Sequence, residues 1–160
     1  MTEQMQVSLI KSGIEPIFAL LVRDNGNIMF GVVMIEQLRK RLLDRDNPVR
    51  IHLIGVAGAG MSGIARMLLE MGHRVSGCDR VTSEETERLQ QSGLRFACPH
   101  SADAVADAEI VIYSSAIRED NVALAAARKL GSLCLRRAEC LAAILNNKKG
   151  VVVAGTHGIP

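Results

Sequence analysis

The sequence predicts an α/β protein with a doubly wound parallel sheet, and three observations support this fold class. From Arg50 onward, short apolar stretches typical of buried strands alternate with amphipathic segments of helical period. A glycine-rich segment, 55–63, lies at the first change from strand to helix. Several expected helices are followed by a glycine, which commonly ends a helix. Strands linked in this way are parallel with right-handed crossovers, so a Rossmann-like domain is expected.

The apolar pattern predicts strands at 51–54, 74–77, 94–97, 109–113 and 133–135, and the start of a further strand at 151–154. Helices are expected at 64–71, between Thr82 and Gly93, and at 101–106, 122–130 and 138–145. Thr82 and Glu85 have the spacing of a capping box at the start of the second helix. At 160 residues the chain has room for one ordinary α/β domain.

The first 33 residues differ in character from the rest. Two apolar runs, 17–22 and 28–33, flank an Asn-Gly pair at 25–26, which is a strong hairpin signal. Alternatively, Met34 is the natural start and the preceding residues are an upstream extension. A helix follows from Met34 and ends near Pro48. The expected division is therefore an extension at 1–49, the Rossmann-like domain at 50–146, and at 147–160 a linker with the truncated start of a second domain.

Composition argues against nucleic acid and membrane partners. The formal charge is +2, and the chain has one Tyr, three Phe and no Trp, so neither a basic stripe nor an aromatic stacking platform is expected. The basic residues between Arg39 and Arg45 alternate with Leu and are interpreted as a solvated helix face. No apolar run approaches the ~20 residues of a membrane span, and no export signal is evident. The expected location is cytoplasmic.

The four cysteines form no Cys-x-x-Cys pair, so no metal site is expected. Cys98 and Cys134 lie in or beside apolar stretches and are expected to be small buried residues.

The glycine-rich segment carries the main chemical signal. Six residues form a G-x-G-x-x-G pattern between a strand and a helix: Gly58, Ala59, Gly60, Met61, Ser62 and Gly63. Asp79 follows about 20 residues later, at the end of the next strand, where a carboxylate can accept hydrogen bonds from a ribose. Such a loop lets a pyrophosphate approach free backbone N–H groups at a helix N-terminus. The alternative is a glycine turn that merely packs helix on strand.

A second polar segment lies at the carboxyl end of the fourth strand, where such sheets place their ligand crevice. It contains Ser114, Ser115 and Ala116, and the two hydroxyl groups can contact phosphate or sugar oxygens. Alternatively, the serines cap the next helix.

The ordered set of motifs resembles the Mur ligase family, specifically ligases of the UDP-N-acetylmuramate–L-alanine type. The matching segments are 51–55, 58–65, 76–79, 114–117, 137–139 and 154–158. The resemblance implies that the glycine loop holds the pyrophosphate of UDP-N-acetylmuramate and that Asp79 and the Ser114–Ala116 segment surround the nucleoside and phosphates. It also implies that His100 reaches the substrate and that Arg137 is a phosphate partner. From the residues alone, His100 could equally be an exposed neighbour of a helix cap, and Arg137 could equally be a surface residue. The other two histidines of the domain, His52 and His73, are interpreted as packing or surface residues.

The sequence departs from the family at one important place. Gly155, Thr156, His157 and Gly158 match the start of the family's ATP loop, but Ile159 and Pro160 stand where the family has Lys-Thr-Thr. ATP and Mg²⁺ are implied for the full-length family, whereas no cofactor and no catalytic residue are assigned to this chain. We therefore expect a ligase portion cut inside its ATP loop, which binds UDP-N-acetylmuramate without ligating it. Two alternatives are an NAD(P)-binding Rossmann domain of an oxidoreductase and a non-functional ligase remnant; the oligomeric state is left open.

Overall fold

The computed structural model describes residues 21–24, 27–30 and 32–145. Several predictions lie outside these residues and are not addressed by the structure. They concern the turn at 25–26, the linker and strand at 147–154, and the four residues Gly155, Thr156, His157 and Gly158.

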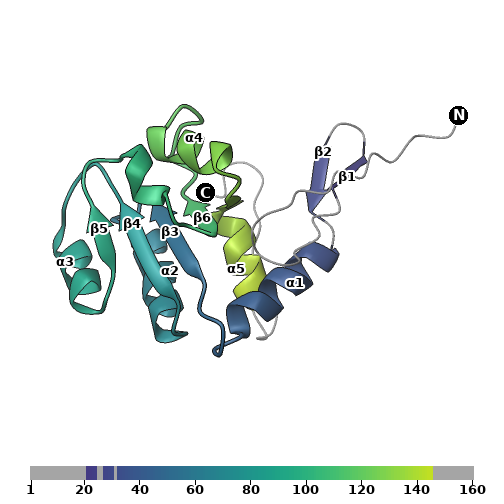
Figure 1. Cartoon of the computed structure of the whole chain (residues 1–160), viewed down its shortest axis with the longest axis horizontal. Helices are drawn as coiled ribbons and strands as arrows, with labels where there is room; N and C mark the ends of the chain where they lie inside the picture. The colour runs from purple at the N-terminus through teal and green to yellow at the C-terminus, as the bar shows by residue number, and fades with distance from the viewer. Residues whose placement is uncertain (1–20, 25–26, 31, 146–160) are drawn as a thin grey trace, which may run out of the picture.

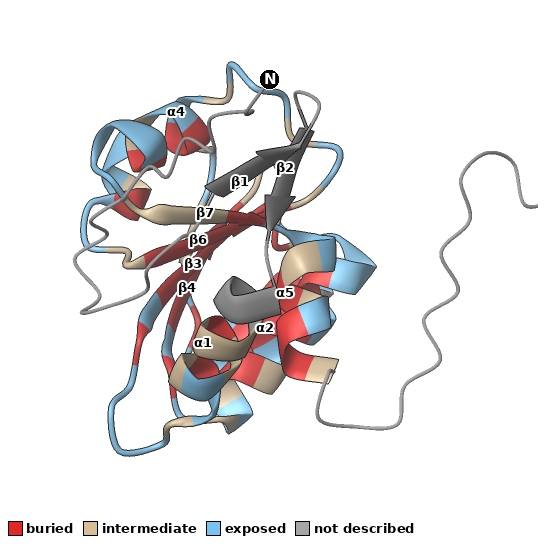
Figure 2. Ribbon diagram, turned by 90° about the vertical axis from the view of Figure 1, so that its right-hand side faces the viewer, coloured by how far each residue is buried: buried red, intermediate tan, exposed pale blue. Residues whose placement is uncertain are grey.

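Five parallel strands form the central sheet in the order β5-β4-β3-β6-β7 (Figure 1 labels the first four, Figure 2 also β7). The strands are β3 (Arg50–Ile54), β4 (Arg74–Cys78), β5 (Arg95–Ala97), β6 (Ile110–Tyr113) and β7 (Leu133–Arg136). The chain runs from β3 to β4 and β5 on one side and then returns to β6 and β7 on the other. The strand order therefore reverses between β3 and β6, which confirms the predicted doubly wound sheet.

Helices cover both faces of this sheet (Figure 2). They are α1 (Val32–Leu43), α2 (Ala59–Glu70), α3 (Glu84–Gln91), α4 (Val122–Lys129), α5 (Arg137–Leu145) and the short 3₁₀ helix η1 (Ala102–Val105). One apolar cluster joins α1, α2, α3 and α5 to one face of the sheet, and a smaller cluster joins η1 and α4 to the other. Side chains alternate along each strand, so Leu53 lies in the first cluster and Ile54 in the second.

The segment before the sheet contains the predicted hairpin and helix. Strands β1 (Leu21–Asp24) and β2 (Asn27–Phe30) pair antiparallel, with Asp24 opposite Asn27. Helix α1 follows and begins two residues earlier than predicted. Its Leu38 and Leu42 are buried in the same cluster as Ala143 and Ile144 of α5, so α1 shares the core of the sheet domain.

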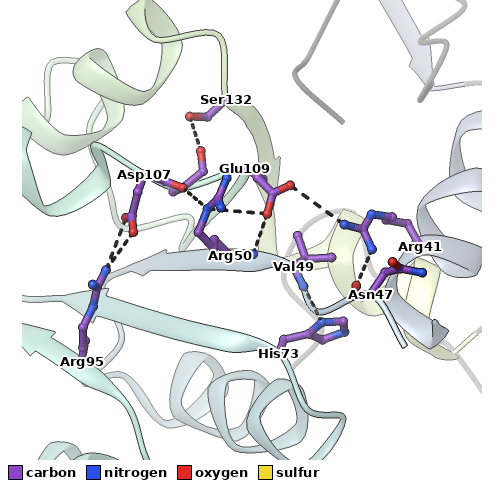
Figure 3. A network of polar contacts seen from close by, with 10 residues as sticks. Arg41, Asn47, Val49, Arg50, His73, Arg95, Asp107, Glu109 and Ser132 are labelled. Atoms are coloured by element: carbon purple, nitrogen blue, oxygen red, sulfur yellow. Dashed lines mark hydrogen bonds and ion pairs between the residues drawn. The ribbon is translucent and has the colours of Figure 1, made fainter. Parts of the chain in front are cut away.

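Polar contacts also hold α1 and the loop after it to the sheet (Figure 3). Nε2 of His73 lies 2.8 Å from the Leu42 carbonyl oxygen, and the Val49 N–H donates to Nδ1 of the same ring at 3.1 Å. Glu109 accepts the backbone N–H of Arg50 at 2.9 Å and pairs with Arg41 at 3.9 Å. These contacts fix the entry of the chain into β3.

The basic residues of α1 and the loop after it are only partly a solvated face. Lys40 and Arg45 are exposed as predicted. Arg39 and Arg41 are partly buried, and each pairs with an acidic residue, Arg39 with Glu36 at 3.1 Å and Arg41 with Glu109.

Among the described residues, no helix is both long enough and apolar enough to cross a lipid bilayer.

Two local predictions are wrong. Helix α3 is capped by Ser83 and Thr86, whose hydroxyl groups accept each other's backbone N–H, and not by Thr82 and Glu85. The reason is that Thr86 faces the core while Glu85 turns outward to pair with Arg66.

Cys98 is exposed, not buried, because it lies beyond β5 in the loop leading to η1. Cys134 is partly buried, and the fully buried cysteines are Cys78 and Cys140.

Candidate functional site

A cleft of about 500 Å³ lies at the carboxyl ends of β3, β4 and β6, beside the point where the strand order reverses. It is lined by Gly55, Ala57, Gly58, Asp79, Arg80, Val81, His100, Ser114, Ala116, Ile117, Arg118, Asp120 and Asn121. Two other clefts, of about 510 and 740 Å³, contain residues from the amino ends of the strands and from one sheet face. The carboxyl-end cleft is the candidate site because open α/β sheets bind their ligands there.

Two backbone hydrogen bonds hold the turn from β3 to α2 against the end of β4. The N–H groups of Gly55 and Val56 both donate to the Cys78 carbonyl oxygen, at 2.8 and 3.3 Å. Gly55 has a φ of +85°, a conformation that favours glycine. A β-carbon on Gly77 would lie 2.8 Å from the Val56 side chain, so Gly77 is required for this close approach.

Asp79 orders this turn as well as lining the cleft. One carboxylate oxygen accepts the Ala57 N–H at 2.9 Å, and the other accepts the Arg80 N–H at 2.7 Å. Each carboxylate oxygen has two lone pairs, so Asp79 retains capacity to accept a ligand hydroxyl group.

Helix α2 begins at Ala59, inside the segment that the sequence suggested was still a turn. Gly58 is its N-cap and supplies no side chain, so no side chain caps the first N–H groups. Ala59 and Gly60 are exposed, and the free N–H groups of this helix end face the glycine turn. This arrangement suits an anion.

The remaining residues of the glycine motif differ in what they offer a ligand. Met61 is 1% exposed and belongs to the core, and the buried Ser62 donates its hydroxyl to the Ala59 carbonyl oxygen at 2.9 Å. Met61 can therefore offer a ligand only its backbone N–H group, and the Ser62 N–H already donates to the Gly58 carbonyl oxygen at 2.8 Å. Gly63 is exposed, and a β-carbon there would have no neighbour within 4 Å.

The serine segment forms a turn over the glycine loop. The Ser114 hydroxyl accepts the Ala116 N–H at 3.1 Å, and the Ser114 carbonyl oxygen accepts the Ile117 N–H, also at 3.1 Å. Ser114 and Ala116 line the cleft, whereas Ser115 is exposed outside its lining. The cap of α4 is Asn121, whose side chain accepts two backbone N–H groups, so the serines are not the cap.

His100 lies in the cleft wall and is only partly exposed. Its Nδ1 is 3.0 Å from Sγ of Cys78. Burial lowers the pKa of His100, Asp79 opposes this effect and Arg80 adds to it. His100 is therefore expected to be mainly neutral at neutral pH. Sequence reasoning did not find its contact with Cys78.

Arg137 is the first residue of α5 and reaches the start of α2. A β-carbon built on Gly60 would lie 2.5 Å from Nη1 of Arg137, so the guanidinium group lies directly over Gly60. No ion pair of Arg137 is found within the described part of the chain. The structure thus brings together Arg137, the glycine loop and the N-terminus of α2, beside a cleft that holds Asp79, His100 and Ser114.

Comparison with known proteins identifies relatives. A family model described as "Mur ligase family, catalytic domain" matches residues 50–149. UDP-N-acetylmuramate–L-alanine ligases of Chlorobium luteolum and Campylobacter curvus are 47% and 44% identical over 110 and 109 residues. Each alignment covers 68% of this chain but only 23% and 25% of the relative. This chain therefore spans about a quarter of the length of these curated relatives.

A solved structure agrees with this similarity. The UDP-N-acetylmuramate–alanine ligase of Thermotoga maritima matches with a TM-score of 0.61 and 32% identity, over 63% of this chain and 24% of that protein. The family model covers more than half of this chain, and the chain therefore belongs to the Mur ligase family.

Proposed function

We propose that this chain is the N-terminal, UDP-N-acetylmuramate-binding portion of an ATP-dependent ligase that joins L-alanine to UDP-N-acetylmuramate in peptidoglycan synthesis. The relatives that share 43–47% identity with residues of this chain carry that name, which supports the choice of substrate.

One observation carries the proposal: the guanidinium group of Arg137 lies over Gly60 at the uncapped N-terminus of α2. A diphosphate placed there would meet free backbone N–H groups, the positive end of the helix dipole and a planar cation. All three favour a multiply charged anion. Gly60 leaves room for this approach because it has no side chain.

The residues of the adjacent cleft have complementary roles in the proposal. Asp79 accepts a ribose hydroxyl while it holds the turn at Ala57. His100 and Ser114 lie in the wall of the same cleft and contact the phosphates or the sugar. These residues bind and orient the ligand, and none of them is assigned a covalent step.

The residues at the position of the family's ATP loop, 155–160, do not fit ATP and Mg²⁺. A phosphate-binding loop uses a lysine ammonium group and a metal-binding hydroxyl group. Here Gly158 is followed by Ile159 and Pro160, which carry neither group. We therefore propose that this chain binds the UDP-sugar without catalysing ligation by itself.

The organisation of the chain and its location are also part of the proposal. Residues 50–146 form the sugar-nucleotide domain, 1–49 an extension that contributes α1 to its core, and 147–160 the start of an ATP-binding domain. A cytoplasmic location is proposed for the same protein.

Calorimetric titration of the full chain with UDP-N-acetylmuramate tests the function, with NADH and NADPH as parallel controls. Saturable binding of the UDP-sugar alone is expected. Binding of a nicotinamide cofactor instead would contradict the proposal in favour of an oxidoreductase domain. No binding of any of the three by a folded chain would indicate a ligase remnant without function.

A further inference from the structure

A row of four polar side chains crosses the interior from one sheet face to the candidate site. His52 and Ser76 are neighbours in the register of β3 and β4, and Nδ1 of His52 lies 2.8 Å from the Ser76 hydroxyl oxygen. Nε2 of His52 is 3.2 Å from Sγ of Cys78, which is in turn 3.0 Å from Nδ1 of His100. His52, Ser76 and Cys78 are at most 8% exposed, so water does not separate these groups.

The protonation state of each group follows from its burial. Burial raises the pKa of Cys78 to about 12, and Asp79 adds to this, so Cys78 is a thiol at neutral pH. Burial lowers the pKa of His52 to about 4, so His52 is neutral. A buried thiol of this kind is not a nucleophile. Its role is limited to donating one hydrogen bond and accepting another.

The available hydrogens allow two arrangements of the row. A thiol has one hydrogen, so Cys78 donates to one imidazole ring and accepts from the other. In the first arrangement Ser76 donates to His52, His52 donates to Cys78, and Cys78 donates to Nδ1 of His100. The hydrogen of His100 is then on Nε2. In the second arrangement every direction is reversed, and the hydrogen of His100 is on Nδ1.

The first arrangement is favoured because it satisfies the Ser76 hydroxyl hydrogen within the protein. In the second arrangement the Ser76 hydroxyl accepts from His52, and its own hydrogen has no acceptor among the described residues, so it must turn to solvent in the clefts that Ser76 lines. Ser76 is only 8% exposed, so contact with solvent is limited and the second arrangement is the less stable of the two. Nδ1 of His100 is occupied by Cys78, and Nε2 has no hydrogen-bond partner in the described part of the chain. Nε2 is therefore the nitrogen available to a ligand in the cleft.

We propose that Cys78 is a positioning residue that holds His100 in the Nε2–H tautomer, so that the neutral ring donates a hydrogen bond to a phosphate oxygen of the sugar nucleotide. The ligand part of this inference rests on the proposed function, whereas the tautomer part does not. Cys78 acts only through His100 and does not touch the ligand.

Nitrogen-15 NMR of the imidazole rings in the full, ligand-free chain tests the tautomer directly. The His100 signals are assigned by their loss in His100→Gln. At neutral pH we expect Nε2 of His100 to carry the hydrogen in the wild type and in Cys78→Ser, which keeps a donor and acceptor. Cys78→Ala is expected to give a mixture of tautomers. A wild-type His100 with its hydrogen on Nδ1 would overturn the proposal, even if the Cys78 variants failed to fold.

Titration with UDP-N-acetylmuramate tests the consequence for binding. Cys78→Ala is expected to weaken binding by roughly threefold to tenfold, the usual effect of one hydrogen bond, and Cys78→Ser by much less. Cys140→Ala is the matched control, since Cys140 is an equally buried thiol in the apolar core and far from His100 in the fold. It should change neither the His100 signals nor the affinity.

The two readouts separate failure of this inference from failure of the proposed function. If the wild type does not bind the UDP-sugar, the proposed function fails while the tautomer is still decided by NMR. If the wild type binds, and Cys78→Ala binds equally well with unchanged His100 signals, the positioning role of Cys78 is wrong and the proposed function stands.

Discussion

The guanidinium group of Arg137 lies over Gly60, and a β-carbon at Gly60 would be 2.5 Å from its Nη1 atom. Arg137 is the first residue of α5 and Gly60 the second residue of α2, and both helices start at the carboxyl edge of the same sheet. The absence of a side chain at Gly60 therefore serves two purposes. It exposes the N-terminus of α2, and it makes room for a cation beside that helix end.

Gly60→Ala is expected to weaken binding of UDP-N-acetylmuramate on the order of tenfold, because the added methyl group displaces the guanidinium group and covers the helix end. The clash is with the far end of a flexible side chain, so the free energy of unfolding should change by less than about 1 kcal/mol. Calorimetric titration and urea unfolding measure the two effects.

Gly63→Ala is the matched control in the same helix. A β-carbon at Gly63 has open space, so alanine should stabilise α2 by about 0.5–1 kcal/mol and leave binding unchanged. Equal losses of affinity in the two variants would show that the contact between Gly60 and Arg137 is not what matters.

Arg137→Ala should reduce the affinity for the UDP-sugar by on the order of tenfold or more, because a charge-assisted hydrogen bond to phosphate is lost. Its neighbour Arg136 provides the comparison. The Arg136 side chain pairs with Glu119 at 3.8 Å and lies over the Tyr113 ring, with 5.8 Å between the guanidinium carbon and the ring centroid. Arg136→Ala is expected to bind nearly as the wild type does. Similar losses of affinity in Arg137→Ala and Arg136→Ala would indicate that the ligand responds only to the overall positive charge. In that case added salt would weaken binding to the wild type and reduce the difference between the variants.

Asp79→Ala is expected to lower the free energy of unfolding by about 1–2 kcal/mol, since the backbone N–H groups of Ala57 and Arg80 lose their acceptor. Binding of the UDP-sugar should also weaken, because the glycine turn becomes less ordered and the ribose loses its hydrogen-bond acceptor. Asp120 lines the same cleft but is exposed and pairs with Arg118. Asp120→Ala should change neither the free energy of unfolding nor the affinity for the UDP-sugar by much. If it had the same effect as Asp79→Ala, the loss of a negative charge alone would explain both.

Much of this architecture follows from local sequence patterns. Strand and helix order, and the ends of three helices at Gly72, Gly93 and Gly131, were predictable because apolar period and positive-φ glycines act locally. The burial of Met61 could also be predicted from the sequence, since Met61, Ile64 and Leu68 have the spacing of one helix face. The glycines at positions 55, 58, 60 and 63 favour a turn in the same segment, and this signal competes with the helical spacing.

The polar interior was not predictable in the same way. The contact between His52 and Cys78 depends on the register of β3 against β4, and that of Cys78 with His100 on the path of the loop after β5. Neither is encoded in the spacing of residues along the chain. The exposure of Cys98 depends on the same loop.

Leu42→Ala tests whether α1 belongs to the cooperative unit. Leu42 is 1% exposed and packs with residues of α5, so its truncation should lower the free energy of unfolding by about 2–5 kcal/mol. The adjacent Leu43 is 43% exposed, and Leu43→Ala should change stability by less than about 0.5 kcal/mol. Urea unfolding followed by circular dichroism compares them. A mild effect of Leu42→Ala would mean that α1 is docked too weakly to contribute to the core.

Acid should destabilise the fold through His52 before the carboxylates are protonated. Burial lowers the pKa of His52 from 6.5 to about 4. Between these values the unfolded chain binds a proton that the folded chain does not, so the free energy of unfolding falls as the pH falls. From neutral pH to about pH 5 the loss through His52 is about 2 kcal/mol. His73 and His100, whose pKa values are also lowered by burial, act in the same direction.

His52→Asn removes this titration while an amide can still pair with Ser76. Its stability at neutral pH is expected to be lower, but the decrease toward about pH 5 should be shallower than in the wild type. His100→Asn should keep most of the wild-type slope, because His100 is less buried. Urea unfolding at a series of pH values measures all three slopes. Parallel curves for wild type and His52→Asn would mean that folding does not lower the pKa of His52, which would contradict its burial among Ser76 and Cys78.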